Sequence, residues 1–107
     1  MTNQELEYKV LKWLEKNPNI TQRQLAKDLG VSLGKAHYLI NSLIQVGWVK
    51  LGNFRRSDNK MGYMYLLTPV GIAEKANITR RYLVRKETEY QQLKHEIDRL
   101  KTEVERF

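Results

Sequence analysis

The longest uninterrupted stretch of this chain lies at its C-terminus, because no proline occurs after Pro69 and no glycine after Gly71. Thr68 followed by Pro69 is typical of a helix start, with a threonine cap and a proline at the first helical position. At about 1.5 Å per residue, a helix from there to the last residue would span roughly 57 Å, far more than a small domain can cover. The sequence therefore predicts a compact domain over residues 1–70 and one extended helix over residues 71–107.

Three shorter helices are expected in the N-terminal part. The first spans residues 3–16, the second opens at the cap Thr21 and ends at Gly30, and the third follows the cap Ser32 and ends at Gly47. Apolar residues recur in each at helical spacing and should face inward. They are Leu6, Val10, Trp13 and Leu14 in the first, Leu25, Ala26 and Leu29 in the second, and Leu33, Ala36, Ile40, Leu43 and Ile44 in the third.

The hydrophobic period then changes from that of a helix to that of a strand. Residues 48–54 and 63–67 are rich in aromatic and apolar strand formers. The polar, basic segment between them, residues 55–62, suits the tip of a hairpin. Three helices followed by such a hairpin describe a winged helix-turn-helix, so the predicted fold class is mainly α with a small β part.

The turn between the second and third helices carries the strongest local signal. Ala26 is small where two helices must cross closely, Gly30 stands where the turn needs a left-handed residue, and Val31 fills the angle between the helices. The third helix then presents polar residues outward, as a DNA-reading helix does. The alternative is that these helices only pack a core, as in winged-helix modules that bind other proteins.

A DNA-binding role assigns the third helix to the major groove and the start of the second to flanking phosphates. The expected contacts on these helices are Thr21, Gln22, Arg23, Ser32, Gly34, Lys35, His37, Tyr38 and Asn41. On the hairpin tip, where arginine suits phosphates or a narrow minor groove, they are Arg55, Arg56, Asn59 and Lys60. The alternatives are that His37 is an ordinary surface histidine, Tyr38 part of the core, and the tip only solvated.

The net charge of +7 favours a polyanionic partner, and most of the basic excess lies in residues 1–68. The chain has no cysteine, which excludes disulfides, Fe–S clusters and cysteine-based zinc sites. We find no Ser/His/Asp set, phosphate loop or metal-ligand cluster, so we expect no enzymatic activity and no cofactor. No apolar run approaches the ~18–20 residues of a membrane span, and the first residues, MTNQE, show no basic region followed by an apolar stretch as a signal peptide would. A cytoplasmic protein is expected.

The long last helix carries apolar residues at alternating spacings of four and three, as in a coiled coil. The expected dimerisation residues are Leu83, Tyr90, Leu93, Ile97, Leu100 and Val104. In a parallel pair Glu89 faces Lys94 and Glu96 faces Lys101, whereas an antiparallel pair would oppose like charges. The sequence thus predicts a parallel homodimer. Ile72 and Ala76, at the start of the stripe, should pack on the chain's own domain; for Leu83 both roles stay open.

Three segments form a familiar pattern together with this helix. They read TQRQLAKDLGVSLGK at residues 21–35, LIxxGWVK at residues 43–50 and YxYLLTPxG at residues 63–71. With this pattern the chain resembles the MarR-like winged-helix regulators, and most closely the short group called MarR family EPS-associated transcriptional regulators. The resemblance implies sequence-specific DNA binding and a regulatory link to exopolysaccharide genes. In larger MarR proteins a wing Asp-x-Arg places arginine in the minor groove; here residues 58–60 end in lysine, which leaves that role to Arg55 or Arg56.

The sequence therefore predicts a homodimeric transcription regulator that binds a pseudo-palindromic site in double-stranded DNA. The alternative is a winged-helix assembly module that binds partners through its coiled coil and has little DNA specificity. No residue pattern identifies a small-molecule effector.

Overall fold

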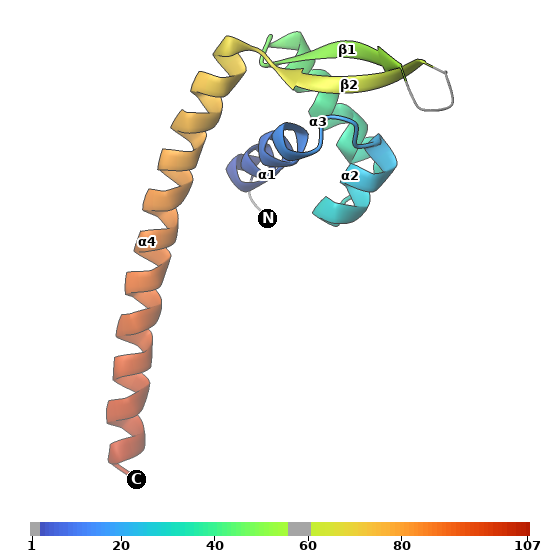
Figure 1. The fold of residues 1–107 in the computed structure, drawn as a ribbon. Coiled ribbons are helices and arrows are strands. Elements are labelled where there is room, and N and C mark those ends of the chain that lie inside the picture. Colours follow the sequence, from blue (N-terminus) through green and yellow to red (C-terminus); the bar gives the residue numbers. More distant parts are fainter. Residues whose placement is uncertain (1–2, 56–60) are drawn as a thin grey trace.

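A computed structural model describes residues 3–55 and 61–107, without the side chains of Phe54, Arg55 and Met61 (Figure 1). The elements follow in the order α1 (Asn3–Lys16), α2 (Gln22–Leu29), α3 (Leu33–Gln45), β1 (Val49–Arg55), β2 (Met61–Leu67) and α4 (Pro69–Glu105). The predicted fold class is confirmed: three short helices, a two-stranded hairpin and one long C-terminal helix.

The helix starts are set by three hydroxyl caps that the sequence predicts. Thr21 Oγ1 accepts a hydrogen bond from the backbone N–H of Gln24 at 3.0 Å, and Ser32 Oγ accepts one from Lys35 at 3.1 Å. Thr68 Oγ1 accepts from the N–H of Gly71 at 3.0 Å, next to Pro69. Each cap satisfies a donor that has no partner inside its helix, which fixes where α2, α3 and α4 begin.

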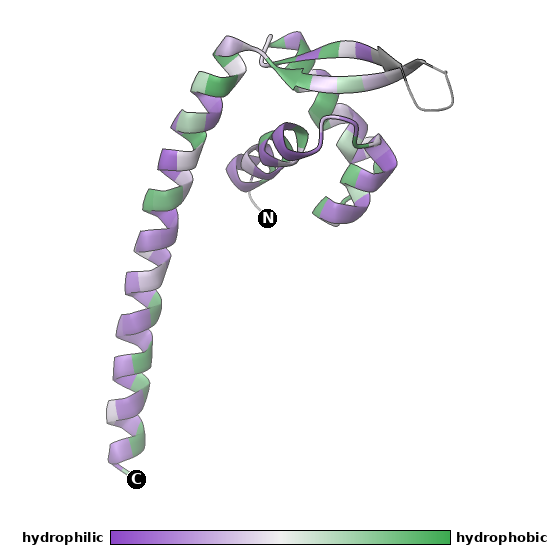
Figure 2. Cartoon of the chain, in the orientation of Figure 1, coloured by the Kyte–Doolittle hydropathy of each residue, from purple (hydrophilic) through white to green (hydrophobic). Residues whose placement is uncertain are grey.

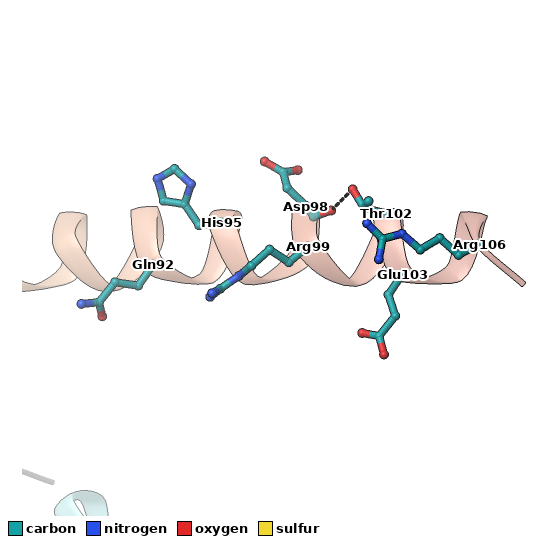
Figure 3. A pocket seen from close by; sticks show the side chains of 7 residues that line it. All are labelled: Gln92, His95, Asp98, Arg99, Thr102, Glu103 and Arg106. Atoms are coloured by element: carbon teal, nitrogen blue, oxygen red, sulfur yellow. Dashed lines mark hydrogen bonds between the residues drawn. The ribbon is translucent and has the colours of Figure 1, made fainter.

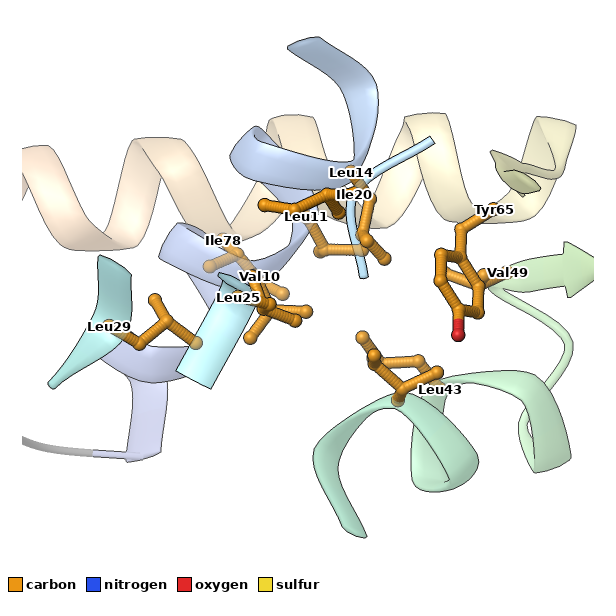
Figure 4. Packing of buried hydrophobic residues seen from close by; sticks show 11 residues of the cluster. Val10, Leu11, Leu14, Ile20, Leu25, Leu29, Leu43, Val49, Tyr65 and Ile78 are labelled. Atoms are coloured by element: carbon orange, nitrogen blue, oxygen red, sulfur yellow. The ribbon is translucent and has the colours of Figure 1, made fainter. Parts of the chain in front are cut away.

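A single apolar core lies between the three short helices, the hairpin and the first turns of α4 (Figure 4). Leu11 is fully buried here, although the predicted stripe of α1 omits it, while Trp13 is only partly buried. A tryptophan is large and commonly keeps part of its ring in solvent. In α3 the buried residues are Ala36, Ile40 and Leu43.

The prediction that Leu33 faces inward on α3 is wrong, because this residue is 45% exposed. It has the right spacing from Ala36, but it occupies the first position of the helix, at the edge of the core. Ile44, at the other end of the stripe, is partly buried against the core.

The hairpin is antiparallel, with Val49 opposite Leu67 at its base and Arg55 opposite Met61 at its far end. Each strand reaches further toward the tip than the predicted ranges. Two further backbone hydrogen bonds hold the hairpin. The N–H of Tyr65 donates to the carbonyl of Pro18, in the loop between α1 and α2, at 2.9 Å, and the N–H of Thr68 donates to the Trp48 carbonyl at 3.0 Å and closes the hairpin base.

The first turns of α4 pack on the domain through a different face from the predicted one. Gly71 is buried against the backbone of Trp48, Ile78 is buried in the core, and the half-buried Tyr82 stacks on Tyr8 of α1. Ile72 and Leu83 are 57% and 56% exposed, so the expectation that the apolar stripe itself begins on the domain is wrong for Ile72 and Ala76. These residues lie about 100–160° around the helix from Gly71 and Ile78, and so point beside or away from the domain.

Beyond Tyr82, α4 leaves the rest of the molecule (Figure 1), and every residue from 83 to 107 is exposed. The molecule consequently measures 70 × 27 × 23 Å. None of the helices in residues 3–55 and 61–107 combines the length and apolar content that crossing a membrane requires.

Candidate nucleic-acid interface

The turn between α2 and α3 is compact and closed by backbone hydrogen bonds. Gly30 adopts φ 69°, in the left-handed region that favours glycine. Its N–H donates to the Lys27 carbonyl at 3.2 Å, and the N–H of Val31 donates to the Ala26 carbonyl at 3.0 Å. Val31 packs against the core. These contacts set how α3 crosses α2, as the predicted helix-turn-helix requires.

The face of α3 that points away from the core is polar and open. His37, Tyr38 and Asn41 are exposed, and the 64% exposure of Tyr38 shows that it is not part of the core. Lys35 Nζ lies 5.4 Å from the centroid of the Tyr38 ring, a cation–π contact that draws the ammonium along the helix face. A side chain at Gly34 would meet only Ser32 Oγ, at 4.0 Å, so a partner can approach the backbone closely there.

The start of α2 lies beside this face. Arg23 and Thr21 are exposed, and Gln22 is half-buried. The Gln22 side chain bridges two elements: its Nε2 donates to the Tyr65 hydroxyl at 3.4 Å, and its Oε1 lies 3.0 Å from His37 Nδ1. The Gln22–His37 contact therefore joins the start of α2 to the exposed side of α3. We call Thr21–Arg23 and the exposed residues of α3 the reading face.

The hairpin tip carries the other predicted contacts. Arg56, Asn59 and Lys60 lie outside the described residues, as does the side chain of Arg55, the last residue of β1. Their contribution stays a prediction from sequence.

Tyr63 is a candidate that the sequence reasoning missed. It lies opposite Asn53, two residues along β2 from the buried Tyr65, and therefore on the same side of the hairpin. Tyr65 is 8% exposed, whereas Tyr63 is 70% exposed, because the hairpin has passed the edge of the core there. Strand alternation together with the distance from the hairpin base is the signal that points to it.

No group of three or more His, Asp or Glu side chains that could hold a metal ion occurs within the described part of the chain. The buried residues described are all apolar, so the polar chemistry of the molecule lies on its surface. The reading face is accordingly suited to binding a partner through hydrogen bonds and charge.

Comparison with known proteins agrees with this geometry. Residues 3–50 match a protein-family model described as winged helix-turn-helix DNA-binding. The chain has a winged helix-turn-helix fold. No curated protein sequence matches it.

The solved structures that resemble this chain include MarR-family regulators. Wild-type MarR from E. coli is 28% identical over 69% of this chain, with a TM-score of 0.55, and this chain spans about half of it, 53%. The adhesin competence repressor AdcR from Streptococcus pyogenes is 19% identical, with 88% of this chain and 66% of that chain covered and a TM-score of 0.63. MepR of S. aureus in a DNA complex is 18% identical, with coverages of 97% and 78% and a TM-score of 0.63.

The winged domain (α1 to β2) is followed by a second candidate surface on the free part of α4. Leu93, Ile97 and Leu100 are 55%, 42% and 52% exposed and recur on one face of the helix. Figure 2 shows apolar segments recurring along one edge of this half of α4. We call this face the seam; its residues are those predicted for dimerisation, Leu83, Tyr90, Leu93, Ile97, Leu100 and Val104.

The face of α4 opposite the seam is polar and of mixed charge (Figure 3). Seven side chains of this one helix line a shallow hollow there: Gln92, His95, Asp98, Arg99, Thr102, Glu103 and Arg106. Because a single helix supplies all of them, the hollow is open helix surface and not a cleft between elements. The asymmetry between the two faces is typical of a helix that pairs along one side.

Proposed function

We propose that this chain is a transcription regulator that binds a specific site in double-stranded DNA as a homodimer. The observation that carries the proposal is the reading face: a cap-defined α3 presents exposed polar side chains beside exposed Arg23, in a winged domain that matches a DNA-binding family model. The net charge of +7 suits a polyanionic partner.

In this proposal α3 enters the major groove, which is wide enough for one helix. Ser32, Lys35 and Arg23 face phosphates, while Tyr38 and Asn41 face base edges. The hairpin lies on the flanking backbone or minor groove, where Arg55, Arg56, Asn59 and Lys60 supply charge and Tyr63 supplies a hydroxyl. Phosphate contacts set register and affinity, and the groove contacts set sequence preference.

In the proposed dimer, the two copies contact each other along the seam. In a parallel pair, Glu96 of one chain faces Lys101 of the other, and Glu89 faces Lys94, so the flanking charges attract. Within one chain Glu89 already contacts Lys86 Nζ at 3.1 Å and Arg85 Nε at 3.4 Å, so the second of these pairings competes with local ones. Parallel pairing places both winged domains at the same end, as a pseudo-palindromic site requires.

The seam is energetically adequate for association only with help from elsewhere. Full burial of a leucine or isoleucine side chain contributes about 1.5–3 kcal/mol. Leu93, Ile97 and Leu100 are already about half covered in the single chain, so pairing gains roughly half of that amount for each. Association costs about 4–15 kcal/mol in lost freedom of the partners, so the three side chains from each chain offset much of that cost. We therefore expect further contacts between the first turns of α4, where Ile72 and Leu83 are exposed on the same side.

The relatives support the DNA-binding part of the proposal. A MarR variant from E. coli has been solved with operator DNA and is 28% identical over 69% of this chain, with 51% of that chain covered and a TM-score of 0.53. The link to exopolysaccharide genes rests on the resemblance to the EPS-associated regulators. It predicts that the bound sites lie upstream of such genes.

The proposal is tested by an electrophoretic shift with genomic fragments, with and without excess nonspecific competitor DNA. We expect a subset of fragments to stay bound under competition, and fragments upstream of exopolysaccharide genes to be among them. Arg23→Ala should lower the dependence of log affinity on log salt by about one unit, because it removes one phosphate contact. Arg99→Ala, on the outer face of α4, is the matched control and should leave it unchanged. Binding that competitor abolishes on every fragment would instead favour the assembly module.

A further inference from the structure

Gln22, His37 and Asn41 form a chain of hydrogen bonds across the two helices of the helix-turn-helix. Gln22 Oε1 lies 3.0 Å from His37 Nδ1, and Asn41 Nδ2 lies 2.9 Å from His37 Nε2. At the other end, Gln22 Nε2 donates to the hydroxyl of the buried Tyr65 at 3.4 Å. Both ring nitrogens of His37 therefore have partners inside the protein, although the ring itself is exposed.

The donors and acceptors of these hydrogen bonds, with the amides oriented in this way, fit one tautomer of His37. An amide oxygen can only accept a hydrogen bond, so the contact with Gln22 Oε1 requires a proton on Nδ1. In the neutral ring Nε2 then carries no proton and accepts from the Asn41 amide N–H. With the amides oriented in this way, the neutral ring therefore carries its proton on Nδ1.

The arrangement leaves Asn41 with a defined set of free groups. One amide N–H is used by His37, and the other N–H and Oδ1 remain for an outside partner. Adenine presents N7 as an acceptor and its amino group as a donor in the major groove, which one N–H and one oxygen of asparagine match.

We propose that Gln22 and His37 are positioning residues that hold the Asn41 amide in the orientation that reads adenine. This inference rests on the proposed DNA-binding function and reassigns two residues that the sequence suggested as DNA contacts. The hydroxyl of Tyr65 on β2 contacts Gln22. The same row of hydrogen bonds therefore links the orientation of the Asn41 amide to the hairpin.

The competing arrangement has the same hydrogen bonds with every donor and acceptor exchanged. With both amides turned over, His37 would carry its proton on Nε2 and donate to Asn41 Oδ1. The two arrangements place the ring proton on different nitrogens, so they can be told apart in the free protein, without DNA.

The first experiment is a long-range ¹H–¹⁵N correlation spectrum of the imidazole rings in the full chain. The chain has two histidines, so His95→Gln, on the outer face of α4, assigns the His37 signals by difference. We expect the neutral form of the His37 ring to carry its proton on Nδ1, and to lose that preference in Gln22→Leu. A proton on Nε2 in the unmodified protein, or an unchanged tautomer in Gln22→Leu, would overturn the proposal.

The second experiment uses a duplex recovered by selection with the protein. The base pair that Asn41 reads is the one whose replacement weakens binding by the unmodified protein but leaves the affinity of Asn41→Ala unchanged. His37→Ala and Gln22→Leu should each lose discrimination at that same A·T pair, by about tenfold, with an unchanged salt dependence. Circular dichroism should show both variants folded.

The outcomes distinguish the positioning role of Gln22 and His37 from the DNA-binding function. Full discrimination at that pair in both variants would overturn the positioning role and leave the DNA-binding function intact. Failure of the unmodified protein to prefer any duplex would overturn the proposed function and the adenine reading together. The tautomer spectrum would still test the hydrogen bonds among Gln22, His37 and Asn41.

Discussion

Tyr82 of α4 stacks on Tyr8 of α1, with ring centroids 4.8 Å apart and an angle of 21° between the ring planes. The Tyr82 hydroxyl also donates to Glu5 Oε1 at 3.2 Å. This is the last point at which α4 packs on the winged domain, because every residue after it is exposed. The pair of rings therefore fixes the direction in which the long helix leaves the domain.

Replacing Tyr82 should loosen that junction in two steps. Tyr82→Phe removes only the hydrogen bond and should lower the free energy of unfolding by about 0.5–1.5 kcal/mol. Tyr82→Ala also removes the ring stack and should cost about 0.5–1.5 kcal/mol more. Thermal unfolding of the three proteins measures both steps, and equal stability of the Phe and Ala variants would show that the stack contributes nothing.

The same contact makes stability depend on pH. Burial by itself raises the pKa of Glu5, but the hydrogen bond from Tyr82 and the charges of Lys9 and Lys86 outweigh it, so the pKa lies below its usual value. A carboxyl whose pKa is lowered by folding stabilises the protein above its unfolded pKa, and that contribution disappears as the pH falls through the lowered value. The difference in melting temperature between the unmodified protein and Tyr82→Phe should therefore shrink in acid. A difference that stays the same from neutral to acid pH would show that the carboxylate form is not the partner of Tyr82.

Two glycines give opposite predictions for the same substitution. A Cβ at Gly71 would collide with the backbone carbonyl oxygen of Trp48, which cannot move without disturbing the base of the hairpin. Gly71→Ala should therefore destabilise the protein by about 1–3 kcal/mol. Gly34→Ala is the matched control: its Cβ meets only Ser32 Oγ, at 4.0 Å, and alanine favours the helix by up to about 1 kcal/mol. Denaturant unfolding of both variants measures the contrast, and a stable Gly71→Ala would refute the tight approach of α4 to Trp48.

Charges placed on the seam should dissociate the proposed dimer. Leu93→Asp combined with Ile97→Asp puts like charges where two copies meet, so sedimentation equilibrium should give the mass of one chain. Gln91→Asp combined with His95→Asp has the same spacing and added acidity on the other side of α4, and should stay dimeric. A dimeric mass for the seam variant would mean that another surface holds the copies together.

The sequence predicts the local features of this fold well and the tertiary ones less well. The caps Thr21, Ser32 and Thr68 are confirmed because a hydroxyl and the N–H three residues later decide them, without help from the rest of the chain. The predicted face of α4 toward the domain was wrong. The coiled-coil period runs back to Ile72, whereas packing against Trp48, the core and α1 buries Gly71, Ile78 and part of Tyr82.

The candidate site divides in the same way. Exposure of Tyr38 and Asn41 follows from helical spacing and is visible in the sequence. The contact of His37 with Gln22 is not, because it joins two helices and depends on the angle at which they cross. The hairpin contacts at Arg56, Asn59 and Lys60 stay predictions.

In the proposed dimer, two winged domains held together by α4 read two halves of one DNA site. Hydroxyl-radical footprinting on a selected duplex shows the half-sites, and sedimentation of the complex gives the number of chains. We expect two chains per duplex and two protected half-sites centred about one helical turn apart, roughly 34–36 Å. A single chain per duplex with one protected segment, or no protected segment at all, would contradict it.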